Sequence, residues 1–439
     1  MESKILNKLH QLVLNGHTVC TDSRMAKPGN IFFALKGDNF NGNLFVNLAL
    51  EKGCVAAVAD DRSFSAPNIF TVDDVLATLQ NLSLLHRKHF NLPVVGITGS
   101  NGKTTTKELV HAVLSTTFST LATKGNLNNH IGVPLTLLSL GPEHQMAIIE
   151  MGANHVGEVG QLSEFALPNF GLITNIGKAH LEGFGSLENI ILTKTELYKH
   201  VNRHNGLVFI NGDNPLLCEK SEGNRIFYGQ NEKHHCSGQV NQNKPFIGIS
   251  FKVNKKFGKA LKGTTGHINT RLVGVYNFEN IMAALTIGLY FGVSPTKAIK
   301  AIESYVPANS RSQLIENGRN TILLDAYNAN PTSMEAAIES FSEFGNKPRA
   351  VMLGDMLEMG SSSPMEHKHI INLLLQKKFE LIILVGPEFK SVAPARKDFI
   401  VFDTAIAAAS WLLKNPFRGY HILVKGSRGM QMEKVIECL

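Results

Sequence analysis

The chain has 439 residues, which allows two to four domains of roughly 100–200 residues each. Hydrophobic residues make up 43% and charged residues 18%, which excludes a disordered or fibrous protein, and no apolar run approaches the roughly 20 residues of a membrane span. The net charge of +7 suits an anionic partner, but the lysine-rich stretches lack the interleaved aromatic residues of a single-strand binder, so no nucleic acid is expected.

The location expected for this chain is the cytoplasm. Its N-terminus has apolar residues at helical spacing and no small-residue cleavage site after an apolar core. The cysteines are few and scattered, which favours a reducing compartment over a disulfide framework or a Cys₄ zinc site. They are Cys20, Cys54, Cys218, Cys236 and Cys438.

Residues 1–90 are predicted to form a small α/β domain. Short apolar runs such as IFFAL and GCVAAVA are broken by Gly and Asn. A helical stretch from Val72 to Phe90 leads to Pro93, and proline disfavours helix at the residue before it. The first domain boundary is therefore placed at residue 90.

Residues 91–311 and 312–439 are predicted to form two further α/β domains. In the first, the short β-branched runs PVVGIT, MAIIE and FGLITNI alternate with helical patterns, as in a buried parallel sheet. Frequent Gly and Asn between about residues 207 and 272 suggest a β-rich insertion. The alternation restarts with TILLD and continues through HILVKGS, which predicts a doubly wound unit.

A glycine-rich segment links a predicted strand to a predicted helix and is typical of a phosphate-binding loop. Its glycines let backbone N–H groups turn toward a phosphate, and the helix N-terminus adds about half a positive charge. Lys103 would reach the terminal phosphates and the Thr104 hydroxyl would bind Mg²⁺. The usual loop begins with a glycine where this chain has Ile97, so a plain β–α turn is the alternative. The predicted nucleotide-contacting residues are Thr98, Gly99, Ser100, Asn101, Gly102, Lys103, Thr104 and Thr105.

Two further polar residues follow predicted strands, where an open α/β sheet binds its ligands. Glu150 closes MAIIE, and its carboxylate could hold Mg²⁺ near Thr104 or be a solvated loop acid. His180 lies in a Gly-rich loop after FGLITNI, where it could ligate a metal or cap a turn.

Lys194 falls in the middle of an apolar helical stripe. The helix is predicted to begin after Ser186, which would be its N-cap. A lysine in such a stripe either extends its amine to water or faces a polar site inside the fold. A desolvated lysine has a lowered pKa, and its neutral amine can react with CO₂ to form a carbamate, a carboxylate-like metal ligand. The stripe consists of Leu187, Ile190, Ile191, Leu197, Tyr198 and Val201.

Strings along nearly the whole chain occur in the order found in Mur ligases, the ATP-dependent amide-bond ligases of peptidoglycan synthesis. They are ITGSNGKTTTKE, EMGANHVGE, NIGKAHLEGFGS, TKTEL, GVYNFENIMAA, DAYNANPTSM, LGDMLEMG and VKGSRGMQMEKV. The resemblance implies an α/β, three-domain Mur ligase architecture. A UDP-substrate domain would precede a central ATPase domain with a P-loop-type, mostly parallel sheet and a C-terminal Rossmann-like ligase domain. The family loop reads Thr-Gly-x-x-Gly-Lys-Thr, so Ile97 is no departure from it.

The resemblance also implies roles for residues around ATP. Lys194 would be the carbamylated lysine of the family, and it would bind metal together with Thr104, Glu150 and His180. Asn277 and Asn280 would face the nucleotide, although many members have histidine where this chain has Tyr276. The implied catalytic residues are Lys103, Lys194, His180, Glu150, Arg311, which would reach the phosphates, and Asp325, which would lie near ATP.

DAYNANPTSM, LGDMLEMG, KGSRGMQME and TDSR are most similar to the D-alanyl-D-alanine-adding branch of the family. That branch implies ATP- and Mg²⁺-dependent joining of D-Ala-D-Ala to UDP-MurNAc-tripeptide through an acyl phosphate. The chain is expected to act as a monomer. The diaminopimelate-adding branch has Asp-Asn-Pro-Arg in its C-terminal domain, whereas the nearest string here, DNPL, lies in the central domain and lacks the arginine. The implied substrate contacts are Ser23, Arg24, Asn128 and Asn129 for the UDP-linked substrate and Tyr327, Asn328 and Asn330 for the dipeptide side.

Two alternatives to this function stay open at the sequence level. The first is another Mur-type or folylpolyglutamate-type ligase, which would use a different acceptor. The second is a P-loop regulatory protein that binds ATP without ligation. A lysine inside an apolar stripe and a second Rossmann-like unit argue against a simple switch, because it needs neither.

Overall fold

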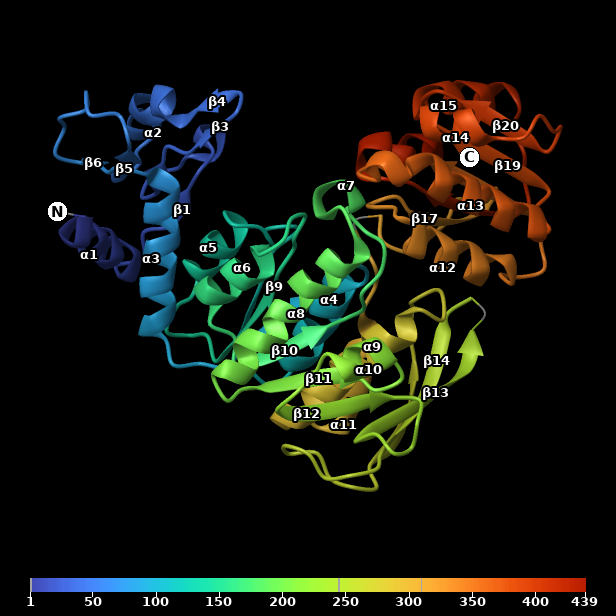
Figure 1. The fold of residues 1–439 in the computed structure, drawn as a ribbon, viewed down its shortest axis with the longest axis horizontal. Coiled ribbons are helices and arrows are strands. Elements are labelled where there is room, and N and C mark those ends of the chain that lie inside the picture. Colours follow the sequence, from blue (N-terminus) through green and yellow to red (C-terminus); the bar gives the residue numbers. More distant parts are fainter. Residues whose placement is uncertain (1, 244, 309) are drawn as a thin grey trace.

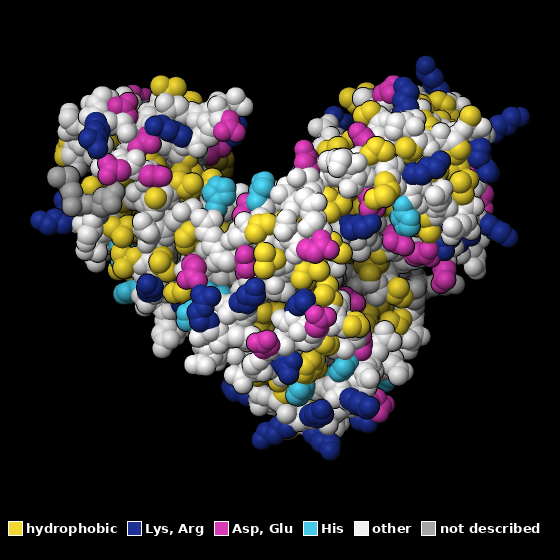
Figure 2. All heavy atoms as spheres, in the orientation of Figure 1, with side chains coloured by type: hydrophobic (Ala, Val, Ile, Leu, Met, Phe, Trp, Pro, Cys, Tyr) yellow, Lys and Arg dark blue, Asp and Glu magenta, His cyan; other side chains and the backbone are white. Residues whose placement is uncertain are grey.

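The structure is a computed structural model that describes residues 2–243, 245–308 and 310–439. Within these ranges the chain forms three sheets, of four, nine and six strands, and one two-stranded ribbon. The N-terminal and C-terminal lobes stand apart above the central lobe (Figure 1), and Figure 2 shows a wide notch between them. None of the described helices is both long and apolar enough to cross a membrane.

The N-terminal lobe is built on a small parallel sheet with the order β1-β2-β5-β6. Phe32 and Phe33 on its second strand are fully buried on opposite faces, because side chains alternate along a strand. Helix α3 also packs against α5 (Gly132–Leu137) and α6 (Glu158–Ala166) of the central lobe, so it joins the two lobes. The elements are α1 (Glu2–Leu14), β1 (Val19–Cys20), β2 (Ile31–Phe33), the ribbon β3 (Lys36–Gly37) and β4 (Phe40–Asn41), α2 (Val46–Glu51), β5 (Ala56–Ala59), β6 (Ile69–Thr71) and α3 (Val75–His89).

The central sheet has the order β15-β14-β13-β12-β11-β10-β7-β9-β8. Its strands are parallel except for the antiparallel pairs β13–β14 and β14–β15. The strands are β7 (Val94–Thr98), β8 (Thr120–Ala122), β9 (Met146–Glu150), β10 (Phe170–Ile173), β11 (Leu207–Asn211), β12 (Asn224–Gly229), β13 (Cys236–Asn243), β14 (Ile247–Val253) and β15 (Thr265–Asn269). The expected β-rich insertion is therefore not a separate unit, because its strands extend the same sheet.

Helices cover both faces of this sheet. Val95 and Ile97 of β7 pack in one apolar cluster with α4 and α10, while Val94 packs in the other with α5, α6 and α8. The helices are α4 (Lys103–Leu114), α5 (Gly132–Leu137), α6 (Glu158–Ala166), α7 (Leu181–Phe184), α8 (Leu187–Arg203), α9 (Pro215–Glu219), α10 (Asn277–Phe291) and α11 (Pro295–Ser304). Strand β7 is thus buried on both faces, and the loop that follows it, residues 99–102, lies at the carboxyl end of the sheet.

The C-terminal sheet has the order β16-β17-β21-β18-β19-β20, and only the pair β16–β17 is antiparallel. Helices α12, α13 and α14 cover one face, and α15 covers the other. The elements are β16 (Gln313–Glu316), β17 (Thr321–Asp325), α12 (Pro331–Ser342), β18 (Arg349–Gly354), α13 (Ser363–Gln376), β19 (Leu381–Val385), α14 (Pro387–Val392), β20 (Phe399–Phe402), α15 (Ala405–Lys414) and β21 (His421–Lys425).

The predicted fold class is confirmed, since three α/β lobes follow one another along the chain. The boundary proposed after residue 90 falls between α3 and β7, and the one after residue 311 falls between α11 and β16. These boundaries stay a prediction. Helix α3 packs against both the N-terminal lobe and the central lobe, so it contributes to both.

Candidate active site

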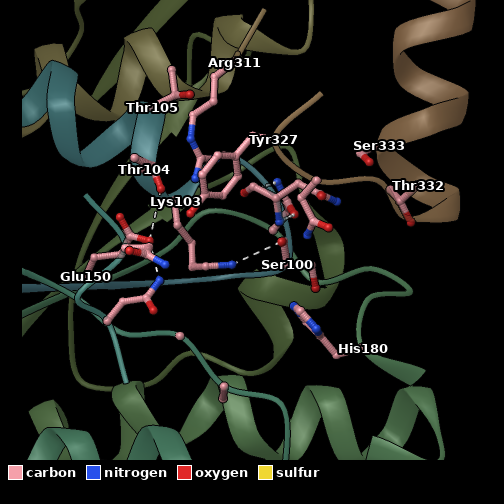
Figure 3. A pocket seen from close by; sticks show the side chains of 18 of the residues that line it. Ser100, Lys103, Thr104, Thr105, Glu150, His180, Arg311, Tyr327, Thr332 and Ser333 are labelled. Atoms are coloured by element: carbon pink, nitrogen blue, oxygen red, sulfur yellow. Dashed lines mark hydrogen bonds between the residues drawn. The ribbon is translucent and has the colours of Figure 1, made fainter. Parts of the chain in front are cut away.

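A cavity of about 830 Å³ lies beyond the carboxyl ends of the central strands. Its lining comes from the central lobe and from the near edge of the C-terminal lobe, as Figure 3 shows. The predicted site residues on this lining are Ser100, Asn101, Gly102, Lys103, Thr104, Thr105, Asn128, Asn129, Glu150, His180, Asn277, Asn280, Arg311, Asp325, Tyr327 and Asn328. The topology thus brings residues more than 200 positions apart in the sequence to one place.

The loop after β7 is held open by its two glycines and by a neighbouring strand end. Gly99 has φ +142° and Gly102 has φ +78°, both in the region that favours glycine. The backbone N–H of Ser100 donates to the Asn175 carbonyl over 2.9 Å, and that of Asn101 donates to the Asn175 side chain over 2.9 Å. Helix α4 then begins at Lys103 with its N-terminus toward the cavity, which makes the loop an anion-binding cradle.

Gly99→Ala is expected to lower the free energy of unfolding of the central lobe by about 3 kcal/mol, because it adds both backbone strain and overlap. A Cβ at this position would overlap the Thr174 hydroxyl. Gly125→Ala is the matched control, with φ +54° and open space around its Cβ, and should cost about 1 kcal/mol. Urea unfolding followed by probes in the central lobe would measure both, and equal losses would contradict the overlap argument.

Lys103 is half-buried at the start of α4, with its amine folded back on the loop. Its Nζ donates to the Gly99 carbonyl over 2.6 Å and to the Ser100 carbonyl over 3.2 Å. Burial lowers the pKa of Lys103 to about 8, which Glu150 opposes and Arg311 reinforces. The amine is therefore poised next to a cavity where an anion would restore its charge.

Glu150 ends β9 directly beside the loop. Its Oε1 accepts hydrogen bonds from Thr104 Oγ1 over 3.1 Å and from Asn128 Nδ2 over 2.8 Å. Its Oε2 is buried and has no hydrogen-bond partner among the described residues, and the whole residue is only 1% exposed. An orphaned carboxylate oxygen beside a hydroxyl is a donor pair suited to a hard divalent cation.

In the described part of the chain, no group of three or more His, Cys, Asp or Glu side chains is placed to hold a metal ion alone. A cation at Thr104 and Glu150 would therefore draw its remaining ligands from water or from a bound phosphate. Mg²⁺ is commonly held in this way, by one or two carboxylates together with substrate phosphates.

His180 precedes α7 and reaches the cavity from the side opposite Arg311 and Tyr327 (Figure 3). Its backbone is left-handed, with φ +54°. Its Nδ1 contacts the Glu358 carboxylate from the C-terminal lobe. His180 is therefore held by Glu358, a residue to which the sequence alone assigned no role.

Lys194 lies inside the central lobe and is not among the residues that line the cavity, and only 2% of the residue is exposed. Ser186 caps its helix as expected, since the Ser186 hydroxyl accepts from the Asn189 N–H over 3.2 Å. The amine lies 5.5 Å from the centre of the Phe184 ring. Burial, reinforced by the charge of Lys103, moves the pKa of Lys194 well below its usual value. The structure favours an inward amine over one that extends to water.

Asn280 fixes the loop from α10, because its Oδ1 accepts from Thr106 over 2.9 Å and its side chain packs against Gly102. Asn277 accepts from the Asn280 amide over 2.9 Å. Tyr276 lines the cavity, and its hydroxyl forms a hydrogen bond with the Ser312 hydroxyl over 3.0 Å. Burial raises the pKa of Tyr276 far above its usual value, so this side chain stays neutral.

The C-terminal lobe contributes a charged edge. The Arg311 guanidinium lies 3.6 Å from the centre of the Tyr327 ring. Asp325 ends β17, accepts from the Ser312 N–H over 3.0 Å and pairs with Lys425 over 2.5 Å. Lys425, only 2% exposed, was missed by sequence reasoning. Lys425 is the last residue of β21, just as Glu150 is the last residue of β9. Its position at the end of an apolar run in the sequence could have identified it as a site residue.

Other predicted residues lie outside the cavity. Ser23 and Arg24 belong to the N-terminal lobe, where Ser23 is buried and Arg24 is exposed and paired with Asp22. Asn330 caps α12 and donates to Asn101 Oδ1 over 2.8 Å, so its side chain is already engaged. Thr98 is buried, and its hydroxyl donates to the Met151 carbonyl over 2.7 Å.

Comparison with known proteins agrees with this geometry. The Mur ligase middle domain matches residues 97–288, and the Mur ligase glutamate ligase domain matches residues 310–428. The chain belongs to the Mur ligase family. Within that family it is 36% identical over 438 residues to the "UDP-N-acetylmuramoyl-tripeptide--D-alanyl-D-alanine ligase" of Bacillus subtilis, with 96% of this chain and 93% of that protein covered.

Two solved structures are similar over the full length. A crystal structure of MurF from Acinetobacter baumannii has a TM-score of 0.87 at 30% identity, covering 98% of this chain and 97% of that one. MurF from Thermotoga maritima, in complex with ADP, has a TM-score of 0.84 at 28% identity, with 97% of each chain covered. The similarity therefore extends over all three lobes.

Proposed function

We propose that the chain joins D-alanyl-D-alanine to UDP-N-acetylmuramoyl-tripeptide at the expense of ATP. The observation that carries this proposal is the full-length similarity to a ligase of that name. The geometry supports it, because a phosphate-binding loop and a charged C-terminal edge face one cavity. Such a cavity can hold a nucleotide, a carboxylate and an amine together.

The chemistry that the site must perform is activation of a carboxylate. A free carboxylate does not acylate an amine at neutral pH, because its leaving group is poor. Transfer of a phosphoryl group gives an acyl phosphate, which the dipeptide amine attacks to form the amide and release phosphate. The protein's task is to position the reactants and neutralise charge. The α4 N-terminus and Lys103 do this for the transferred phosphate.

The donors around the cavity fit divalent cations on two sides. Bound Mg²⁺ would neutralise the phosphate charge and orient its oxygens. Thr104 and Glu150, with its orphaned Oε2, would hold one ion. His180 and a carbamate on Lys194 would hold or orient the second. The low pKa and deep burial of Lys194 support the carbamate, because a neutral amine is the form that reacts with CO₂.

The remaining predicted residues are assigned to substrate and closure. Arg311 would reach the phosphates, and Asp325 would contact the nucleotide while Lys425 holds it in place. Asn128, already bonded to Glu150, and Asn129 would face the UDP-linked substrate, with Ser23 and Arg24 contributing from the N-terminal lobe. Tyr327 and Asn328 would face the dipeptide, and Asn330 would support that side through Asn101.

The affinity for ADP is expected to fall as the pH rises through about 8, by up to about tenfold per pH unit. Lys103, with its pKa lowered to about 8, loses its ammonium in the free protein there, whereas bound phosphate would keep it protonated. Calorimetric titration between about pH 7 and pH 10 at constant Mg²⁺ measures the dependence.

Unfolding does not produce the same trend. Between about 8 and 10.5 the unfolded chain binds more protons at this lysine than the folded chain, so this group makes stability rise with pH. Lys103→Arg keeps its charge over the whole range and should give an affinity that changes little with pH. An equally flat profile in the unaltered protein would contradict the argument.

The function itself is tested by acceptor dependence. The protein is incubated with ATP, Mg²⁺ and UDP-MurNAc-tripeptide, with D-Ala-D-Ala, with single amino acids, or with no acceptor. Phosphate release that requires the dipeptide, with a pentapeptide product seen by mass spectrometry, is the expected result. Release driven better by a single amino acid would indicate another ligase of this fold. Nucleotide binding without acceptor-dependent turnover would indicate a regulatory ATP-binding protein.

A further inference from the structure

The string LGDMLEMG, residues 353–360, contains the end of β18 and the turn that follows it. Asp355 is fully buried, and its carboxylate accepts from two backbone N–H groups at the start of α14. The N–H of Met356 donates to His367 Nε2 over 3.0 Å, and the N–H of Leu357 donates to Ser427 Oγ over 2.8 Å. Three successive residues are therefore fixed to the body of the C-terminal lobe.

Glu358 follows directly and leaves the C-terminal lobe. Its backbone is left-handed, with φ +62°, which turns the chain outward at this point. Its carboxylate contacts His180 Nδ1, and its backbone carbonyl accepts from the Glu182 N–H over 3.0 Å. Glu358 therefore contacts the central lobe at two nearby residues, through its side chain at His180 and through its backbone at Glu182.

A carboxylate can only accept a hydrogen bond, so its partner nitrogen on the imidazole carries the proton. When Nδ1–H donates to Glu358, Nε2 is left with its lone pair. His180 lines the cavity, so the ring is held beside the space where the phosphates would lie. Histidines that act toward a metal or its ligands are commonly oriented by such a carboxylate.

We propose that Glu358 is a positioning residue, which sets the tautomer and the orientation of His180 when the C-terminal lobe docks on the central lobe. The proposal rests on the proposed function for the role of His180. On this proposal, the orientation of His180 in the central lobe depends on the C-terminal lobe, because the imidazole is fixed only when Glu358 contacts it.

A second contact across the same boundary provides a control. Lys178 Nζ pairs with Glu366 Oε1 over 2.6 Å. This pair also joins the central-lobe loop to the C-terminal lobe, but it does not touch His180. Lys178→Met would weaken the docking of the lobes while leaving the imidazole contact in place.

The experiment compares Glu358→Ala with Lys178→Met in the full chain. Glu358→Ala should lower kcat by about 10- to 100-fold with KM values for all three substrates nearly unchanged, and Glu358→Gln, which keeps an acceptor oxygen, should recover part of the rate. Lys178→Met should keep kcat within about threefold of the unaltered protein, because the lost ion pair does not touch His180. Equal losses in Glu358→Ala and Lys178→Met would overturn the proposal, since docking alone would explain them.

A second readout does not depend on turnover. In protein labelled at the histidine Cε1 carbons and free of nucleotide, the His180 resonance, assigned by its loss in His180→Asn, should move in Glu358→Ala and stay in Lys178→Met. An unchanged resonance in Glu358→Ala would overturn the proposal even if kcat fell. Failure of the unaltered protein to use the dipeptide would sink the proposed function instead, and the resonance comparison would still decide the role of Glu358.

Discussion

Lys103→Ala is expected to lower kcat for dipeptide-dependent phosphate release by about 1000-fold, since removal of one group that stabilises transferring charge has effects of this size. Its amine lies at the N-terminus of α4, facing the cavity that Glu150 and Arg311 also line. Alanine leaves the helix dipole and the loop N–H groups in place but removes the only cation on the loop itself. Coupled detection of phosphate and quantification of the amide product measure the loss.

A lysine on the same helix is the matched control. Lys107 is buried, and its amine donates to the Thr123 carbonyl over 2.9 Å, away from the main cavity. Lys107→Met should reduce stability while keeping kcat within about threefold, because it loses a buried hydrogen bond and not a charge at the phosphate. If Lys103→Ala kept the rate of the unaltered protein, the assignment of the loop would be wrong.

Much of the nucleotide side could be predicted because it depends on local sequence. The run PVVGIT became β7, and the glycines after it adopt the backbone that the loop requires. Parallel strands end at one edge of a sheet, which is why Glu150 lies beside Thr104 although the two are 46 positions apart. The helical period placed Lys194 on the inward face of α8, where it is buried. Their catalytic roles stay predictions.

The rest depends on how distant segments meet, which local patterns do not encode. The strands after residue 207 looked like an insertion, but only the pairing of β10 with β11 shows that they continue the central sheet. Glu358 lies in the string LGDMLEMG, but the sequence alone suggests no role for it, because its partner His180 is 178 positions away in another lobe. Ser23 and Arg24 remain outside the cavity because the N-terminal lobe stands apart from it in this arrangement.

Lys194→Ala is expected to lower kcat by at least about 100-fold, since loss of a group that holds or orients a catalytic metal has effects of this order. Only 2% of the residue is exposed, and burial moves the pKa of its amine well below the usual value, which increases the share of neutral amine that can attack CO₂. The reaction joins the nitrogen to the carbon of CO₂ and releases a proton, which leaves an anion where the helix would otherwise present a neutral amine. Alanine removes that anion and leaves a space large enough for a small acid.

Rescue distinguishes a lost carbamate from lost packing. Formate or acetate should restore at least about tenfold of the lost rate in Lys194→Ala, because the added carboxylate replaces the missing anion. The same acids should not rescue Lys103→Ala, which lacks a cation, and Lys199→Ala, an exposed position on the same helix, should need no rescue. With ¹³C-labelled bicarbonate, a carbamate carbon signal should appear in the unaltered protein and be absent in Lys194→Ala. A rate loss that no acid restores, together with no carbamate signal in either protein, would show that Lys194 acts through its amine alone.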